Sequence, residues 1–307
     1  MRLVRIGPAG SETPGALVDE DTFIDLSDVV DDFNEQFFAS GALDSLVQTV
    51  AERVAAGRGE PVGDRRFGAP IARPHQILCI GLNYRDHAAE TGQDVPAEPI
   101  LFTKSPNTLV GPDDDVLVPR GSEKMDWEVE LGIVIGRHSS YLADETEAEA
   151  AIAGYTLVND VSERAWQIER NGQWSKGKSA PTFNPAGPWL VTKDEIEDVL
   201  ALDMWLDVDG QRRQTGSTAT MVFSPTFIVH YLSQFMALEP GDLINTGTPP
   251  GVGMGMKPPT YLHGGETMTL GITRLGTQTQ HVIAHPAAQS PTAQSSSSAQ
   301  SPSADLG

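Results

Sequence analysis

Short β-type runs separated by turn residues set the strongest limit on what this chain can fold into. Each run is rich in β-branched and other apolar residues and is flanked by Gly, Pro, Asn or Asp, which is typical of strands. The runs are QILCIGL, ILFTK, LGIVIGR, GYTLVNDVS, GPWLVT, LDMWLDVDG and TMTLGITRLG. One clear amphipathic helix accompanies them, FSPTFIVHYLSQFMAL, which is followed by the stop-and-turn sequence EPGD. The pattern predicts an α+β fold that is mainly β.

Three regions of different composition divide the chain. Residues 1–70 are expected to form a small N-terminal α+β module, with short strands before a helical pattern over 37–57. The helix would carry on one side Leu43, Leu46, Val47, Val50 and Val54. Residues 71–285 contain the β-type runs and are expected to form the main domain. Residues 286–307 are rich in Ser, Ala, Gln and Pro and have little to bury, so a disordered tail is expected there.

Charge and cysteine content exclude several classes of protein. The 307 residues include 42 acidic and 21 basic side chains, for a formal net charge of -21. Nucleic-acid binding needs a basic footprint, so a DNA or RNA partner is not expected. Apolar runs are too short to span a bilayer, and the N-terminus lacks a signal-peptide core, so no membrane association is expected. A single cysteine, Cys79, rules out a disulfide framework, and a cytoplasmic location is expected.

Three carboxylates alternate at the start of one apolar run. In KMDWEVELGIVIG, Asp126, Glu128 and Glu130 are expected to share one face of a strand. A solvated face is one explanation, but the apolar residues that follow do not alternate, which indicates a strand buried on both faces. Two buried carboxylates this close repel each other unless a cation lies between them. Mg²⁺ and Mn²⁺ prefer oxygen ligands, so these glutamates are candidate metal ligands.

A third carboxylate, Asp160, ends the apolar run GYTLVND. It is a candidate third ligand, because the end of a strand is where side chains leave a packed core. The competing interpretation is an N-cap for a helix over Val161 to Ile168, a common position for Asp.

A histidine and a glutamate form a second candidate group. His87 and Glu90 are three residues apart in NYRDHAAETG, so on a short helix they would lie on one face. A carboxylate can orient an imidazole and raise its basicity, which allows the pair to take a proton from water. A surface pair without a function is the alternative.

Two segments that combine Gly, Pro and Lys complete the candidate chemistry. QWSKGKSAPTF places Lys176 and Lys178 close together, either as a cation for an anionic substrate or as charge balance on a loop. NTGTPPGVGMGMKPP lacks the Gly-Lys-Ser/Thr ending of a P-loop, and its prolines block the helix that a Rossmann turn requires. We interpret it as a backbone loop that approaches a ligand, with Thr246 and Thr248 as hydrogen-bond donors. A G-x-S-x-G motif is absent, and Cys79 lies in an apolar run, so no nucleophile is indicated.

Six ordered segments resemble the fumarylacetoacetate hydrolase family. They are GLNYRDHAAE, ILFTKSPNTLVGP, DWEVELGIVIG, NDVSERAWQ, QWSKGKSAPTFNPAGPWLVT and LEPGDLINTGTPPGVG. The resemblance covers roughly residues 77–272. It implies mixed β-sheets rolled into a barrel-like sandwich, a homodimer, and one Mg²⁺ or Mn²⁺ in each subunit.

The resemblance also implies roles for individual residues. The metal ligands would be Glu128, Glu130 and Asp160, and the catalytic dyad would be His87 and Glu90 on a short lid helix.

Four further residues match functional positions of the family. Lys178 matches the active-site lysine, Arg164 and Gln167 match polar substrate-binding positions, and Thr248 matches a threonine that contacts substrate.

The sequence departs from the family pattern near two of these positions. Ala180 and Pro181 replace a commoner apolar–Asp pair after the lysine, and Glu163 and Ala165 replace the commoner Ala and Asp. These differences leave the substrate open.

The implied activity is metal-dependent hydrolysis of a carbon–carbon bond in a 2,4-dioxo acid of the acylpyruvate type, giving pyruvate and a carboxylic acid. Alternatives on the same scaffold are a decarboxylase or isomerase acting on oxaloacetate or a related 2-oxo acid, and a diketo-deoxy sugar-acid hydrolase. A non-catalytic binding protein would require the loss of a metal ligand or a dyad member, and all five residues are present.

Overall fold

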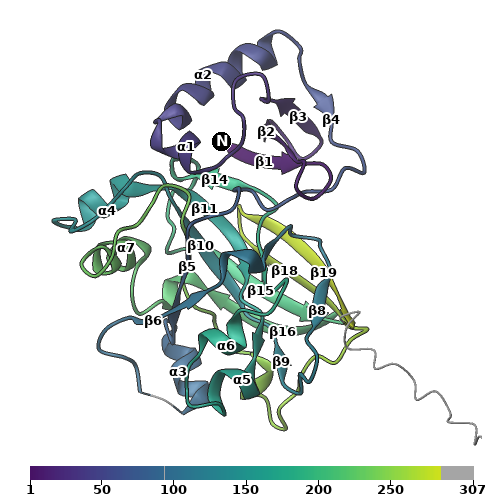
Figure 1. The fold of residues 1–307 in the computed structure, drawn as a ribbon, viewed down its shortest axis with the longest axis vertical. Helices are drawn as coiled ribbons and strands as arrows, with labels where there is room; N and C mark the ends of the chain where they lie inside the picture. The colour runs from purple at the N-terminus through teal and green to yellow at the C-terminus, as the bar shows by residue number, and fades with distance from the viewer. Residues whose placement is uncertain (93, 285–307) are drawn as a thin grey trace, which may run out of the picture.

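A ten-stranded mixed sheet is the largest element of the fold (Figure 1). The computed structural model describes residues 1–92 and 94–284. Across the sheet the strands follow the order β4-β3-β2-β1-β14-β11-β10-β17-β5-β6. In that order their bounds are Glu60–Pro61, Thr22–Asp25, Thr13–Leu17, Arg2–Ile6, Leu190–Thr192, Ile152–Asn159, Val129–Ile135, Leu243–Asn245, Ile77–Gly81 and Ile100–Lys104. Strands β17 and β5 pair in parallel while their neighbours pair antiparallel, which makes the sheet mixed.

A five-stranded sheet packs against the main sheet. Its strands, in the order β16-β15-β18-β19-β8, are Gln211–Ser217, Asp203–Val208, Thr267–Ile272, Gly276–Ala284 and Val116–Val118. Two short pairs complete the β structure: β9 (Met125–Asp126) with β12 (Ser162–Glu163), and β7 (Leu109–Val110) with β13 (Asn184–Pro185). One core cluster contains Leu131 and Ile133 from the main sheet together with Leu206 and Leu270 from the smaller one. The expected mainly β sandwich is therefore confirmed.

Short helices lie around the sheets. The α-helices α1 to α7 are Glu35–Ala39, Ala42–Ala55, Arg85–Thr91, Glu145–Ala151, Arg164–Ile168, Ser175–Lys178 and Pro225–Ser233. The 3-10 segments η1 to η4 are Pro106–Thr108, Lys193–Glu195, Thr218–Thr220 and Gly253–Gly255. Within the described ranges, none of these helices has both the length and the apolar character that crossing a membrane requires.

The one clear helix of the main region forms as α7, because its start carries strong helix signals. The Ser224 side chain accepts the Phe227 N–H at 3.0 Å, and Pro225 occupies the first helical turn. The helix ends at Ser233, five residues before the end of the apolar run.

The N-terminal residues extend the main sheet. Strand β1 pairs with β14 through Leu3 and Leu190, and one core cluster combines Leu3 with Val134 of β10. The helical pattern appears as α2, but its expected apolar side is only partly buried. Leu46 is buried, whereas Val47 and Val54 are 55% and 43% exposed. The division at residue 70 stays a prediction, and the expected tail, residues 286–307, lies outside the described residues.

Strand β10 explains the alternating carboxylates. All seven of its residues are buried. Val129, Leu131 and Ile133 point into the core between the two sheets, so Glu130 points to the opposite face. The strand is buried on both faces, as its unbroken apolar run indicated.

Candidate active site

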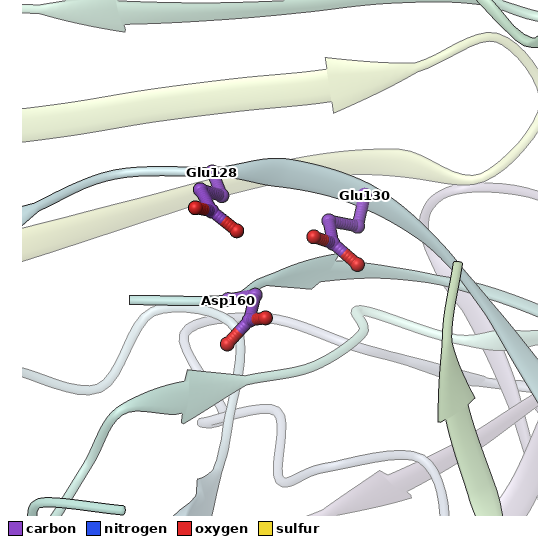
Figure 2. A group of neighbouring side chains, drawn as sticks. All are labelled: Glu128, Glu130 and Asp160. Atoms are coloured by element: carbon purple, nitrogen blue, oxygen red, sulfur yellow. The ribbon is translucent and has the colours of Figure 1, made fainter. Parts of the chain in front are cut away.

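Three carboxylates meet where β10 and β11 pair. Glu130 lies in β10, Glu128 just before it, and Asp160 directly after β11. The pairing places Val129 opposite Asn159, and the Asp160 N–H donates to the Glu128 carbonyl at 2.9 Å. One oxygen from each carboxylate lies within 4.8 Å of the others, and Figure 2 shows the three side chains gathered around one space. All three are buried, so the cluster can hold a metal ion.

Two buried lysines border this cluster. The Lys178 Nζ lies 2.8 Å from Glu128 Oε2 and 2.9 Å from Asp160 Oδ2. The Lys104 Nζ contacts the other oxygen of Asp160 and donates to two backbone carbonyls, Val161 at 3.2 Å and Phe183 at 2.6 Å. Lys178, the expected active-site lysine, thus lies beside the three carboxylates, whereas Lys104 was not expected there.

The two glutamates are in opposite electrostatic situations. Burial alone would raise the pKa of Glu128, but Lys178 and Arg164 hold that pKa well below its ordinary value. Burial, together with the nearby Asp160 and Glu128 carboxylates, raises the pKa of Glu130 well above its ordinary value. Of the two glutamates, Glu130 is therefore the one whose ionised form most needs an added cation.

Asp126 contacts the same arginine as Glu128 but is not one of the three clustered carboxylates. Arg164 contacts both carboxylates, with Nε 2.8 Å from Asp126 Oδ2 and Nη1 2.7 Å from Glu128 Oε1. The Asp126 oxygens also accept the backbone N–H groups of Gly253, at 2.6 Å, and Met254, at 3.0 Å. Asp126 thus ties the glycine loop to β9, just before β10.

Asp160 is not a helix N-cap, so that competing interpretation is wrong. Helix α5 begins at Arg164, and its cap is Glu163, whose Oε2 accepts the Trp166 N–H at 2.8 Å. Another oxygen of Glu163 accepts the Lys124 N–H at 2.8 Å. The glutamate that departs from the family pattern therefore fastens α5 to the strand that carries Asp126.

The expected His–Glu pair forms on helix α3. The His87 Nδ1 lies 3.2 Å from Glu90 Oε2, and the His87 side chain is largely buried. Just before this helix, the buried Asn83 amide donates to the backbone carbonyls of Phe223 and Thr246 and accepts the Phe223 N–H. These bonds fix where α3 leaves β5.

Both candidate threonines are engaged by strand β10. The Thr246 hydroxyl donates to the Leu131 carbonyl at 2.8 Å, and the Thr248 hydroxyl donates to the Val129 carbonyl at 2.9 Å. Gln214 also donates to the Thr248 oxygen. In this structure both hydroxyls donate to the strand, and Thr248 also lines the cavity, so its contact with a substrate stays a prediction.

One cavity of about 60 Å³ collects most of the expected residues. Its lining includes His87, Glu128, Glu130, Arg164, Gln167, Lys178 and Thr248. Lys176 is exposed on helix α6, donates to the Arg170 carbonyl and does not line the cavity. A larger cleft of about 760 Å³ contains none of the expected residues and lies beside Trp189 and Trp205.

Sequence reasoning missed Lys104 and two aromatic residues of the lining, Phe102 and Trp174. A lysine that closes the apolar run ILFTK was a usable signal, since a lysine at a strand end in an acidic core needs a carboxylate partner. Trp174, in a polar glycine-rich segment, gave no such signal.

The C-terminal domain model of fumarylacetoacetate (FAA) hydrolase matches residues 76–283. The chain belongs to the fumarylacetoacetate hydrolase family. It is 50% identical over 281 residues, 91% of this chain and 98% of the relative, to a protein of Burkholderia ambifaria that carries only a provisional name as a hydrolase.

Solved structures agree with this assignment. A fumarylacetoacetate hydrolase from Exiguobacterium antarcticum has a TM-score of 0.79 and 32% identity, covering 93% of this chain and 100% of that one. The maleylpyruvate hydrolase of Sphingobium sp. SYK-6 has a TM-score of 0.77 and 25% identity, with coverage of 93% and 100%. The structure of that hydrolase in complex with manganese(II) and pyruvate is 24% identical to this chain, with a TM-score of 0.76. At this identity the similarity shows the fold alone.

Proposed function

We propose that this protein hydrolyses a carbon–carbon bond in a 2,4-dioxo acid of the acylpyruvate type, in a metal-dependent reaction that gives pyruvate and a carboxylic acid. One observation carries the proposal: a histidine paired with a glutamate and the buried glutamates of a three-carboxylate cluster line a single cavity. Membership of the fumarylacetoacetate hydrolase family supports it.

The cluster fits Mg²⁺ or Mn²⁺. Its donors are all carboxylate oxygens, which hard divalent cations prefer. Glu130 accepts the Gly247 N–H at 2.8 Å and forms no ion pair within the described residues. Glu128, Glu130 and Asp160 would hold such an ion. Its positive charge would stabilise the carboxylate and 2-oxo oxygens of the substrate and the negative charge that bond cleavage leaves.

Arg164 is suited to anchor a substrate carboxylate. It lines the cavity, and its buried Nη2 has no hydrogen-bond partner within the described residues. An unpaired buried guanidinium nitrogen is costly, and a carboxylate would satisfy it. Gln167 accepts from Arg164 Nη1 at 3.0 Å and so holds the guanidinium in place.

His87 and Lys178 would handle the proton and the charge. Glu90 lies at His87 Nδ1 and favours the proton there, so Nε2 is the nitrogen that accepts a proton from water. The water oxygen bonds to the distal carbonyl carbon, and the bond from that carbon to the methylene breaks, leaving its electron pair on the pyruvate fragment, whose methylene carbon then takes the proton back from His87. Although burial opposes it, the Asp160 and Glu128 carboxylates raise the pKa of Lys178, so its ammonium stays charged and can stabilise that fragment.

Proton NMR of the purified protein with acetylpyruvate or with oxaloacetate tests the proposal. Each sample contains Mg²⁺, with a matched EDTA control. Equal amounts of acetate and pyruvate appearing only with metal are expected. Pyruvate from oxaloacetate alone, above the rate given by Mg²⁺ without protein, would instead establish a decarboxylase.

A further inference from the structure

The cavity has an apolar wall in addition to its charged end. The wall consists of Leu82, Phe102, Ile168, Trp174 and Met254, which come from β6, α5, η4 and two separate loops. Burial decreases from the carboxylate cluster, which is almost fully buried, to Ile168, which is 47% exposed. The wall therefore lies on the side of the cavity toward solvent, where the far end of a substrate held at the cluster would extend.

Two aromatic rings form the centre of this wall. Phe102 and Trp174 have ring centroids 5.3 Å apart, and the Lys178 Nζ lies 5.2 Å from the Phe102 ring. The Trp174 ring lies directly over Gly81, where an added Cβ would come within 2.5 Å of the indole. The rings thus continue outward from the lysine that borders the carboxylate cluster, and a glycine leaves the space that Trp174 occupies.

The arginine and the lysine of the lining already form ion pairs with carboxylates of the protein. Arg164 pairs with Asp126 and Glu128, and Lys178 pairs with Glu128 and Asp160. The remaining unpaired nitrogen of Arg164 is the one that suits the carboxylate next to the 2-oxo group. Within the described lining, a second substrate carboxylate would have no cation of its own.

Two polar residues on the neighbouring helices, Lys176 and Gln167, do not supply that missing charge. Lys176 is exposed, donates to the Arg170 carbonyl at 2.6 Å and does not line the cavity. Gln167 lines the cavity but is neutral. A carboxylate placed against the apolar wall would lose water without gaining an ion pair, which is unfavourable, whereas an alkyl or aryl group would gain from burial.

We propose that the apolar wall selects substrates whose distal group is alkyl or aryl, so that the enzyme acts on monocarboxylic acylpyruvates and discriminates against acylpyruvates that end in a second carboxylate. This inference rests on the proposed function for the reaction itself. It separates the chain from a relative such as the maleylpyruvate hydrolase, whose named substrate carries a second carboxylate. Trp174 is the specificity-determining residue.

Binding of two matched 2-oxo acids tests the wall without relying on catalysis. 2-Oxohexanoate and 2-oxoadipate have the same number of carbons and differ only in a terminal methyl or carboxylate, and neither has the second carbonyl that hydrolysis needs. Isothermal titration calorimetry of the Mg²⁺-loaded protein should show at least roughly tenfold tighter binding of 2-oxohexanoate. Equal or tighter binding of 2-oxoadipate, or no binding of either acid, would overturn the proposal.

Kinetics with a matched pair of substrates then connects the wall to turnover. Butanoylpyruvate and succinylpyruvate again differ in a terminal methyl or carboxylate, and kcat/KM should favour butanoylpyruvate by at least roughly tenfold. If neither compound is hydrolysed while the calorimetric preference holds, the proposed reaction is wrong but the proposed selectivity of the apolar wall is supported. A preference for succinylpyruvate would overturn the proposed selectivity of the apolar wall.

Trp174→Ala assigns the preference to one residue. The ratio of the two calorimetric affinities should fall by about fivefold or more, since the indole supplies much of the apolar contact. Trp166→Ala is the matched control, because Trp166 is also partly buried, lies on the nearby helix α5 and does not line the cavity. An unchanged ratio in Trp174→Ala, or the same fall in Trp166→Ala, would remove Trp174 from this role.

Discussion

Gly251 donates its backbone N–H to both carboxylate oxygens of Glu90, at 3.0 and 3.2 Å. The same glycine accepts the Trp127 indole N–H at 3.0 Å, so the glycine loop that meets helix α3 is itself held by a buried tryptophan. Glu90 therefore connects His87 to a fixed backbone position. This contact determines where the imidazole lies relative to the carboxylate cluster.

Gly251→Ala should disturb this contact. Gly251 has a φ of +105°, and an added Cβ would lie 2.0 Å from the Arg213 carbonyl oxygen, so the loop must move and Glu90 loses its donor. We expect kcat to fall about tenfold or more and Tm to fall by roughly 3–10 °C. Gly210→Ala is the control, because Gly210 also has a positive φ, +70°, but has open space around its missing Cβ. It should lower Tm slightly and keep kcat, and a wild-type kcat in Gly251→Ala would contradict the positioning role.

Lys104→Met should destabilise the protein. Lys104 is 2% exposed, and its loss leaves the Asp160 carboxylate with one ammonium and removes the donor of two backbone carbonyls. Removing one partner of a buried charge pair costs about 3–5 kcal/mol in the free energy of unfolding, which urea denaturation in EDTA measures. Lys176→Met, which removes an exposed lysine, should cost less than about 1 kcal/mol. Equal stabilities of the two variants would show that Lys104 does not hold the cluster.

Glu130→Gln should change how stability depends on pH when metal is absent. The folded state raises the pKa of Glu130 above 4.5, so folding favours the protonated form, and that contribution is lost as the pH rises above this value. In EDTA, wild-type Tm should therefore decrease more steeply than that of Glu130→Gln as the pH increases from 4.5.

Metal binding provides the second half of this test. Saturating Mg²⁺ at pH 7 should raise wild-type stability by about 2–3 kcal/mol at a hundredfold excess over Kd, and should affect Glu130→Gln much less. Parallel pH profiles in EDTA, or an equal response to Mg²⁺, would contradict the assignment of Glu130 as a ligand.

Sequence patterns predicted local features of the site better than its long-range contacts. Alternation identified Glu128 and Glu130 because the strand period of two is encoded in neighbouring residues. Asp160 remained ambiguous between a ligand and a helix cap until the family resemblance was considered, because its place beside Glu128 depends on the pairing of β10 with β11. Propensity also placed the α5 cap three residues early, since Glu163 makes a side-chain bond that composition does not reveal.

The residues that escaped prediction are those defined by tertiary contact alone. Lys104 reaches Asp160 across 56 positions of sequence, and Trp174 lies over Gly81 after a long connection. The hydrogen bonds of Thr246 and Thr248 to carbonyls of β10 also depend on tertiary contact and could not be predicted from their segment. An apolar pattern on α2 likewise overestimated burial, because the helix covers the sheet with Leu46 and leaves Val47 in solvent.

Acetate release from acetylpyruvate by wild type and by His87→Ala, each with Mg²⁺ and each with EDTA, tests the dyad-and-metal mechanism most directly. Calorimetry first establishes that both proteins bind Mg²⁺ equally. Wild type should release acetate and pyruvate only with Mg²⁺, and His87→Ala should be slower by about 10²–10⁴-fold, because water then lacks its general base. Full activity of Mg²⁺-loaded His87→Ala, or wild-type acetate release that persists in EDTA, would contradict the mechanism.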